Sequence, residues 1–391
     1  MNDLASPSAH DVAEARPVSH HDQILREKAQ ALLAKADVRI DGDRPWDIKV
    51  HDERVFARVF AHGSMGLGDA YMDGWWDAPA LDEFFTRVLG ARLDEQVEVF
   101  NALIAHLRAR YVNMQRGRKA FKVGHVHYDT GNELFAAMLG KYKMYSCANF
   151  EHTDNLDDAQ EAKLHTVCRR LGLKPGQKVL DIGCGWGQAL KFAAEHYGVS
   201  GVGVTVSSEQ AKYARELCKG LPIEIRVQEY HELNETFDAV YSIGMFEHVG
   251  GKNYRNYFEV VRRCLKAEGL FVLYCIGVNS TPSKPDPWIE KYIFPNSMVP
   301  AASQVTKALE NLFVVEEWRN FGVDYDKTLM AWIANFNAAW PELSKHYDER
   351  FRRMWLFYLA SSAATFRTRR DQLWELTLSP NGVPGGYRAP D

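Results

Sequence analysis

The feature that most limits the fold of this chain is a regular alternation of apolar and amphipathic segments, which begins at residue 179. The first apolar segment and the turn after it have the sequence VLDIGCGWG. Next come a helical segment, WGQALKFAAEHY, an apolar segment, GVGVTV, and a second helical segment, SEQAKYARELCKG, with Ser207 or Ser208 as N-cap and Gly220 as stop. Strands that alternate with helices form a parallel sheet covered by helices, so the pattern predicts an α/β fold.

The same alternation continues toward the C-terminus. Four further segments belong to it: IEIRVQEY, FDAVYSIG, a helix around YRNYFEVVRRCLK, and GLFVLYCIG. Two more strands are predicted at residues 312–321 and 371–379, separated by two long helices rich in aromatic residues. We expect this late pair of strands to close one edge of the sheet. The predicted sheet is therefore Rossmann-like and mostly parallel, with an antiparallel last strand and extra helices.

The length of the chain predicts more than one domain, because 391 residues exceed the usual size of a single domain. We expect a disordered tail at residues 1–22, a small and mainly helical N-terminal domain at residues 23–122, and the α/β domain at residues 123–391. Within the N-terminal domain, residues 63–76 (GSMGLGDAYMDGWW) have the composition of a glycine-rich turn region.

Composition and charge exclude several classes of protein. The formal net charge of -4 argues against a broadly basic protein, so no nucleic-acid partner is expected. The six cysteines are scattered without a C-x-x-C pair, which favours neither disulfides nor a metal site and fits the reducing cytoplasm. The N-terminus has no apolar signal-peptide core, and no run approaches the roughly 18 apolar residues of a spanning helix. We therefore expect a cytoplasmic protein.

Three glycines in the turn after the first strand predict a ligand-binding loop. Gly183, Gly185 and Gly187 let the backbone approach a ligand closely, because glycine has no Cβ and tolerates positive φ. The spacing differs from the G-x-G-x-x-G of dinucleotide-binding proteins, and the next strand lacks the terminal acid of a dehydrogenase, so hydride transfer is disfavoured. The polar residues in that place are Thr205, Ser207 and Gln210. A tight turn without a ligand remains the alternative.

Six motifs occur in order along the chain: YSCANF, DIGCGWG, VGVTVSSEQ, SIGMFEHVG, DPWIEKYIFPN and FGVDYDKTLMAW. Together they resemble the cyclopropane-fatty-acyl-phospholipid synthases over roughly residues 36–385. The resemblance implies a class I S-adenosylmethionine methyltransferase fold in residues 123–391. It also implies methyl transfer to the cis double bond of an acyl chain in a membrane phospholipid, followed by loss of a proton and closure of a cyclopropane ring.

The resemblance also implies a set of residues for the cofactor, S-adenosylmethionine. Tyr145 and Ser146 would close over it, while the glycine loop would carry its methionine part and ribose. The following strand ends add the remaining cofactor residues, which are Thr205, Ser207, Gln210, Glu229 and Tyr230. For Tyr230, an ordinary aromatic residue at the end of a strand is the alternative interpretation.

A second set of residues is implied for a bound bicarbonate ion, which acts as the base in this family. These residues are Cys147, Glu247, the backbone of Ile276, and Tyr325. The family usually has a histidine two residues before Ile276, where this chain has Tyr274, and tyrosine stays neutral at physiological pH. An enzyme that forms methyl-branched or exomethylene chains is therefore one alternative, and a non-catalytic lipid- or cofactor-binding protein is another. Cys147 has no adjacent base or metal ligand, so neither a nucleophile nor a metal centre is expected.

Two clusters of basic residues predict peripheral association with the anionic inner face of the membrane. The first cluster comprises Arg108, Arg110, Arg116, Arg118, Lys119 and Lys122. The second surrounds the aromatic segment FRRMWLFYLASSAATF and comprises Arg350, Arg352, Arg353, Arg367, Arg369 and Arg370. Basic side chains near an anionic surface each contribute about 1 kcal/mol, although solvated faces are the alternative. The family resemblance suggests a homodimer, and the aromatic helices are candidates for an acyl channel.

Overall fold

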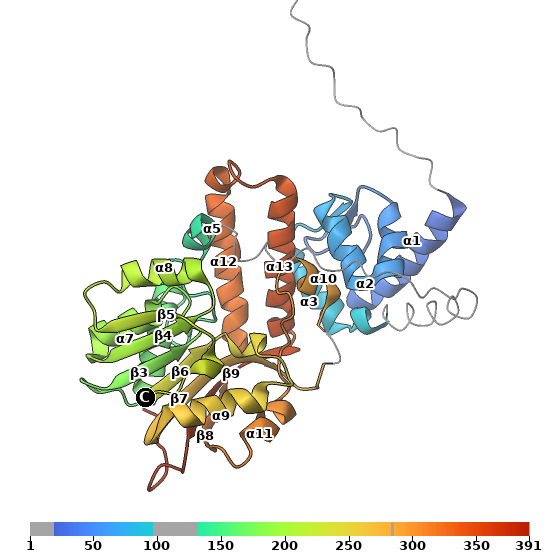
Figure 1. Cartoon of the computed structure of the whole chain (residues 1–391). Helices are drawn as coiled ribbons and strands as arrows, with labels where there is room; N and C mark the ends of the chain where they lie inside the picture. The colour runs from blue at the N-terminus through green and yellow to red at the C-terminus, as the bar shows by residue number, and fades with distance from the viewer. Residues whose placement is uncertain (1–18, 97–131, 283–284, 391) are drawn as a thin grey trace, which may run out of the picture.

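The computed structural model describes residues 19–96, 132–282 and 285–390, and it divides into an α/β part and a helical N-terminal part (Figure 1). The α/β part contains a seven-stranded sheet in the order β5-β4-β3-β6-β7-β9-β8. The strands are β3 (Lys178–Ile182), β4 (Ser200–Thr205), β5 (Ile223–Val227), β6 (Phe237–Ile243), β7 (Leu265–Val278), β8 (Val314–Asn320) and β9 (Asp371–Ser379). Strands β3 to β7 pair in parallel, whereas β9 runs antiparallel between β7 and β8. The predicted mostly parallel sheet with an antiparallel last strand is confirmed.

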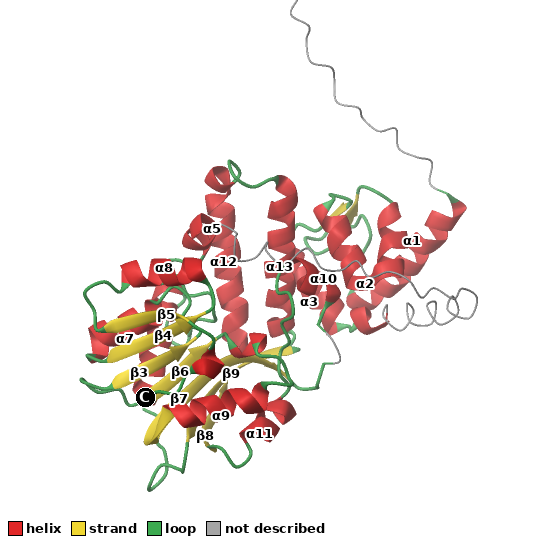
Figure 2. Cartoon of the chain, in the orientation of Figure 1, coloured by secondary structure: helices red, strands yellow, loops and turns green. Residues whose placement is uncertain are grey.

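Helices cover both faces of this sheet (Figure 2). One core contains side chains of α9 (Tyr254–Cys264) and α11 (Ala302–Leu309), and the other contains side chains of α6 (Leu156–Arg170), α7 (Gln188–Tyr197) and α8 (Ser208–Leu217). Alternate residues of β3 enter opposite cores, Leu180 the first and Val179 the second, as the two-residue period of a strand requires. The N-cap of α8 is Ser207, one of the two predicted residues.

Two long helices lie beside the sheet and connect it to the N-terminal part (Figure 1). They are α12 (Gly322–Leu343) and α13 (Glu349–Arg367). The side chains of Trp332, Phe336 and Trp355 are fully buried in the core that these helices share with the N-terminal part. Their aromatic side chains therefore serve mainly to join the two parts of the chain. No helix within the described ranges is both long and apolar enough to cross a bilayer.

Within residues 19–96, the N-terminal part consists mainly of three helices. Its elements are α1 (His20–Leu33), η1 (Ala34–Ala36), β1 (Lys49–Val50), α2 (Arg54–Met72), β2 (Trp76–Asp77) and α3 (Leu81–Gly90). Helix α1 begins earlier than predicted, because Ser19 and Asp22 form a capping box with the Asp22 N–H 3.2 Å from the Ser19 hydroxyl. The residues at 20–22 are therefore helical rather than part of the tail, and the remainder of the predicted tail lies outside the described residues.

The glycine-rich segment at 63–76 is not a turn region, which corrects the prediction from composition. Its first ten residues belong to α2, which is interrupted only at Gly63, where φ is 57° and ψ is -132°. A Cβ at Gly66 would collide with the carbonyl oxygen of Arg58, and one at Gly68 would collide with the indole of Trp288. These glycines are thus required for close packing of the helix rather than for chain reversal.

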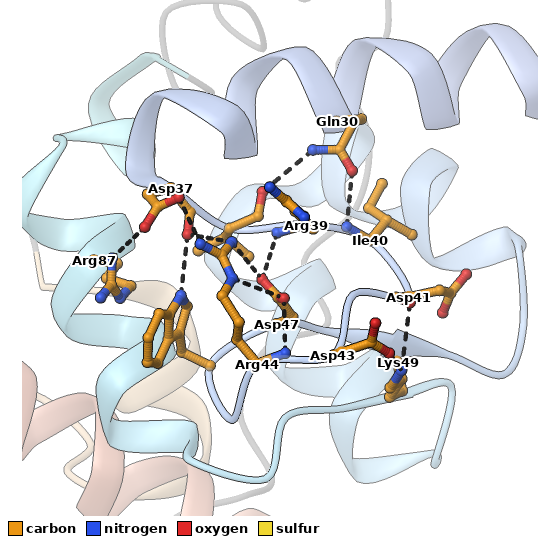
Figure 3. Close-up of polar contacts among 12 residues, drawn as sticks. Gln30, Asp37, Arg39, Ile40, Asp41, Asp43, Arg44, Asp47, Lys49 and Arg87 are labelled. Atoms are coloured by element: carbon orange, nitrogen blue, oxygen red, sulfur yellow. Dashed lines mark hydrogen bonds and ion pairs between the residues drawn. The ribbon is translucent and has the colours of Figure 1, made fainter.

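A polar cluster holds the connection between α1 and α2 (Figure 3). Its centre is the fully buried carboxylate of Asp47, which accepts hydrogen bonds from the Arg39 N–H at 2.8 Å and from Arg44 Nε at 3.0 Å. The Arg44 guanidinium also donates to Asp37 at 2.6 Å, and Arg87 of α3 donates to the same carboxylate at 3.0 Å. This network ties α3 to the loop after α1.

Arginines of α13 and the residues after it hold the N-terminal part. Arg353 donates to Asp77 at 2.6 Å, Arg367 to Asp82 at 2.9 Å, and Arg370 to Asp94 at 2.5 Å. Arg350 also forms an ion pair, with Asp73 at 3.2 Å. These four arginines are therefore paired with acidic side chains, and contact of the second basic cluster with a membrane stays a prediction. The first basic cluster, Arg108 to Lys122, lies outside the described residues.

Candidate active site

A large cavity of about 1290 Å³ opens at the carboxyl ends of strands β3 to β6, where ligands bind in open α/β sheets. Most of the predicted site residues line it: Tyr145, Ser146, Gly183, Gly185, Thr205, Ser207, Gln210, Tyr230, Glu247, Ile276 and Tyr325. Four predicted residues lie elsewhere, namely Cys147, Gly187, Glu229 and Tyr274. The structure thus brings together residues that span about half of the sequence.

The glycine loop has the backbone conformation that its sequence predicts. The φ angles of Gly183, Gly185 and Gly187 are 88°, 51° and 82°, all in the region that favours glycine. A Cβ at Gly183 would lie 2.7 Å from the Met245 side chain, whereas one at Gly185 would meet no other atom within 4 Å. Gly185 therefore leaves open space for a ligand beside the backbone, and Gly183 permits close packing beneath it. Gly187 begins α7 and packs against α8 instead of facing the cavity.

The polar residues after β4 form one hydrogen-bonded turn at the cavity wall. The Thr205 hydroxyl lies 3.0 Å from Gln210 Oε1 and accepts from the Ser207 N–H at 3.2 Å. The Ser207 hydroxyl in turn accepts from the Gln210 N–H at 3.3 Å, as the N-cap of α8. These contacts fix the positions of three polar side chains at the place where a class I methyltransferase would bind its cofactor.

The residues after β5 divide between the cavity and the solvent. Tyr230, in the 3-10 turn η2 (Tyr230–Glu232), lines the cavity and packs edge to face on Tyr257 with ring centroids 5.3 Å apart. Glu229 points away and lies 3.0 Å from the imidazole of His231. Gln228 lines the cavity in place of Glu229. Gln228 is not among the predicted site residues, because no motif distinguishes it from its neighbours.

The loop that carries Tyr145 and Ser146 is held on two sides. The Tyr145 hydroxyl lies 2.8 Å from that of Tyr358 in α13. The Ser146 hydroxyl accepts from Lys163 Nζ of α6 at 2.9 Å, and the Ser146 carbonyl accepts from Gln160 at 3.0 Å. Lys163 is almost completely buried, and burial lowers its pKa to about 7. Lys163 is not among the predicted site residues, because a single lysine on a helix belongs to no motif.

Glu247 is a buried ionisable group at the cavity. It lies in the short turn η3 (Phe246–His248), where its Oε1 accepts from the Ile276 N–H at 2.7 Å. Its Oε2 is buried and has no hydrogen-bond partner within the described part of the chain. Burial raises the pKa of Glu247 to about 7, although the Ile276 N–H acts in the opposite direction. A carboxyl group with this pKa can accept or share a proton near neutral pH.

Aromatic side chains surround the region beside Glu247. Tyr325 of α12 lines the cavity and stacks on Phe366 with ring centroids 4.5 Å apart. Of the aromatic residues proposed from sequence for an acyl channel, Phe357 and Tyr358 also line the cavity, whereas Trp332 and Trp355 are buried in the core. Aromatic faces stabilise cations, so this wall is suited to positive charge that develops in a reaction.

Cys147 and Tyr274 lie together behind the cavity wall. The thiol of Cys147 is fully buried, donates to the Ala148 carbonyl at 3.2 Å, and lies 3.9 Å from the Thr328 hydroxyl. Tyr274 packs against Cys147 and Leu373 and stacks on Phe321 with ring centroids 6.4 Å apart. Burial raises the pKa of both Cys147 and Tyr274 above their ordinary values, so both are neutral at physiological pH. Neither group meets the cavity directly.

Asp181 is a further cavity residue that was not among the predicted site residues. It is the next-to-last residue of β3, two residues before Gly183, and it is buried. Burial raises its pKa to about 8, although the neighbouring Tyr241 side chain acts in the opposite direction. Its place in the DIGCGWG motif was the signal that could have identified it. His248 also lines the cavity, and burial lowers its pKa.

Comparison with known proteins identifies the family. The family model for mycolic acid cyclopropane synthetase matches residues 115–376, which is more than half of the chain. The chain belongs to this family. The cyclopropane-fatty-acyl-phospholipid synthase of Escherichia coli (strain K12) is 50% identical over 361 residues, covering 92% of this chain and 94% of that protein. The predicted family and enzyme class are confirmed.

Solved structures of this family confirm the fold. A cyclopropane synthase from Mycobacterium tuberculosis matches with a TM-score of 0.62 and 27% identity, covering 65% of this chain and 95% of that one. A mycolic acid cyclopropane synthase complexed with SAH and CTAB matches with a TM-score of 0.60 and 30% identity, covering 64% of this chain and 95% of that one. The class I methyltransferase fold and S-adenosylmethionine as cofactor are thus confirmed for the family to which the chain belongs, and bicarbonate stays a prediction.

Proposed function

We infer that this protein transfers the methyl carbon of S-adenosylmethionine to the cis double bond of an unsaturated acyl chain in a phospholipid and forms a cyclopropane ring. The observation that carries the inference is one cavity that joins a glycine loop, a buried carboxyl group and an apolar wall. The name of the Escherichia coli relative, at 50% identity, specifies the substrate class. S-adenosylmethionine supplies an electrophilic methyl group when it is bound.

The protein's own residues meet three demands of this reaction. An alkene is a weak nucleophile, so the chain must be held in line with the methyl donor, and the buried apolar wall achieves this while it excludes water. A carbocation then needs stabilisation, which the faces of aromatic residues such as Tyr325 and Tyr358 provide. Finally, a proton must leave the added methyl group, and Glu247, whose pKa is raised to about 7, lies beside the cavity where it can hold the base for that step.

We further propose that bicarbonate serves as the base and that Glu247, Tyr325 and the segment at Ile276 hold it. The unpartnered Glu247 Oε2 supports this assignment, because a protonated carboxyl there could donate to an anion. The Ile276 N–H is already used by Glu247 Oε1, and Cys147 and Tyr274 lie behind the wall. In this proposal Cys147 and Tyr274 therefore support the wall around the anion and do not contact the anion.

To reach a phospholipid, the protein must associate with the membrane surface. The protein works as a cytoplasmic homodimer that associates peripherally with the anionic membrane surface through Arg108 to Lys122, and residues 23–122 and 123–391 form its two domains. Co-sedimentation with vesicles of phosphatidylglycerol should decrease when the salt concentration rises. Binding that ignores both salt and lipid charge would contradict this part of the proposal.

The decisive experiment is mass spectrometry of phospholipids after incubation with the protein and S-adenosylmethionine labelled in its methyl group. We expect labelled cyclopropane chains, and less product when bicarbonate is removed from the buffer. Methyl-branched or exomethylene chains would instead identify the alternative product class. Saturable cofactor binding without any labelled lipid would identify a non-catalytic binding protein.

A further inference from the structure

The cavity does not end at the proposed active site but continues into the N-terminal part of the chain. Helices α1, α2 and α3 all contribute to its wall there, with Leu33, Phe56, Phe60, Phe85, Val88 and Leu89 among the lining residues. These three helices lie on one side of α13, whereas α12 and the sheet lie on the other (Figure 1). The family model and the solved structures cover mainly the α/β part, so they assign nothing to this region.

The two ends of the cavity differ in chemistry. At the cofactor end the wall includes Asp181, Thr205, Gln210 and Glu247. At the other end the side chains from α1 and α3 are apolar, and the one polar side chain from α2 is that of Ser64. Asp94 and Arg370 also line the cavity, but they form an ion pair with each other at 2.5 Å. The surface of the three helices therefore offers few hydrogen bonds to a cofactor or a headgroup, whereas it suits a hydrocarbon chain.

The wall is continuous where the N-terminal part meets α13. Phe85 of α3 and Phe357 of α13 both line the cavity, and their rings meet edge to face with centroids 4.9 Å apart. The ion pairs of Arg353 with Asp77 and of Arg367 with Asp82 flank this contact. The apolar end is therefore a formed part of the same cavity and not a gap between separate bodies.

The size of the cavity calls for more than one occupant. Sites for small molecules usually enclose about 300–1,000 Å³. The cavity here exceeds that range, at about 1290 Å³. A cofactor and one acyl chain account for the cofactor end and the wall beside Tyr325, and they leave the apolar end without an occupant. A phospholipid carries a second acyl chain, whose chemistry matches that end.

We propose that the cavity between α1, α2 and α3 binds the second, non-reacting acyl chain of the phospholipid. This inference rests on the proposed function, because it concerns the substrate of the same site. In this arrangement the reacting chain lies beside Glu247 and Tyr325, and the two chains diverge on either side of α13. The N-terminal part thereby distinguishes two-chain phospholipids from single-chain lipids.

The test is the variant Val88→Trp, which places a large side chain in the apolar end. Two substrates are compared in detergent micelles: phosphatidylethanolamine with one monounsaturated and one saturated chain, and lysophosphatidylethanolamine with the same monounsaturated chain. Overfilling a packed site should lower kcat/KM for the two-chain lipid about tenfold or more and leave the single-chain lipid about unchanged. The matched control is Val315→Trp, at a valine that is 41% exposed on β8 and remote from the cavity; it should change neither value.

Equal losses on both substrates, or no loss on either, would overturn the inference. Failure of the proposed function has a different signature, namely no cyclopropane product from either lipid with the unaltered protein. A direct measurement does not depend on turnover: a phosphatidylethanolamine with a diazirine at the end of its saturated chain should label peptides from residues 54–90. Val88→Trp should abolish that labelling and Val315→Trp should not. Labelling confined to the α/β part would also overturn the inference.

Discussion

The two ends of the cavity are built in different ways. At the cofactor end, neighbouring residues determine the site, because the glycine loop and the turn from Thr205 to Gln210 each place several groups through local backbone geometry. At the N-terminal end, apolar side chains from three helices and from α13 meet across large sequence separations, through packing contacts such as that of Phe85 with Phe357. The cofactor end therefore depends on local backbone geometry, whereas the apolar end depends on how two parts of the chain pack together.

The largest effect is expected from Glu247→Gln at the cofactor end. Glutamine keeps an acceptor for the Ile276 N–H but cannot exchange a proton, so kcat should fall by about 10²- to 10⁴-fold. The measurement is incorporation of labelled methyl groups into phospholipid. Glu268→Gln, at an exposed glutamate on β7, is the control and should retain full activity. Substantial activity of Glu247→Gln would remove this carboxyl group from the proton-transfer step.

The same variant should show a pH-dependent gain in stability. Folding raises the pKa of Glu247 from 4.5 to about 7, so the folded state binds more protons than the unfolded state between these values. The free energy of unfolding of the unaltered protein therefore decreases as pH rises through this window, relative to Glu247→Gln. Above pH 7, this loss in the free energy of unfolding of the unaltered protein, relative to Glu247→Gln, should reach about 3 kcal/mol. Urea unfolding at pH 5 and pH 8 measures it, and a difference that does not change with pH would contradict the raised pKa.

A smaller effect is expected from Gly183→Ala in the glycine loop. Both Gly183 and Gly176 have positive φ, at 88° and 86°, but only at Gly183 would a Cβ meet another side chain. Each alanine variant should lose about 1–2 kcal/mol of stability from backbone strain. Only Gly183→Ala should also lose cofactor affinity, by about tenfold, because the loop must shift away from Met245. Isothermal titration with S-adenosylmethionine separates the two variants, and equal affinities would argue that the loop tolerates the shift.

The smallest effect is expected where the N-terminal part joins α13. Arg367→Met removes the ion pairs with Asp82 and with Asp326, and because Arg367 is partly exposed the loss should be only about 1 kcal/mol. The difference from the unaltered protein should narrow in high salt, since salt screens such pairs. Thermal unfolding measures both quantities. The control, Lys219→Met, disrupts an exposed pair with Glu216 and should have no measurable effect. A salt-independent loss would point to packing rather than charge.

Much of the α/β part could be predicted because its signals are local. Strand β9 begins and ends at the predicted residues, 371 and 379, and the N-cap of α8 was one of two candidates. The segment at 63–76 was misinterpreted because glycine is common both in turns and where helices pack closely. Only the positions of Arg58 and Trp288 show that the second reason applies at Gly66 and Gly68.

The sequence predicted most residues of the candidate site, but it did not predict which of them line the cavity and which are buried behind its wall. The motifs identified Glu247, Ile276 and the glycine loop, all of which line the cavity. They could not show that Cys147 and Tyr274 face each other behind the wall, because burial is a property of the packed chain. Nor could they show that Lys163 contacts Ser146, since the two residues are brought together only by the docking of α6.

The sequence by itself determined the order of strands and helices, the conformation of the glycine loop and the membership of the family, because hydrophobic period and short motifs act over a few residues. Tertiary structure alone decided which charged groups are free and which are paired. In the sequence, the arginines of α13 and Arg370 form a basic cluster. In the folded chain, Arg353, Arg367 and Arg370 donate hydrogen bonds to acidic residues about 270 to 290 positions away. Long-range packing also creates the apolar end of the cavity, because a wall shared by four helices exists only when all four are in place.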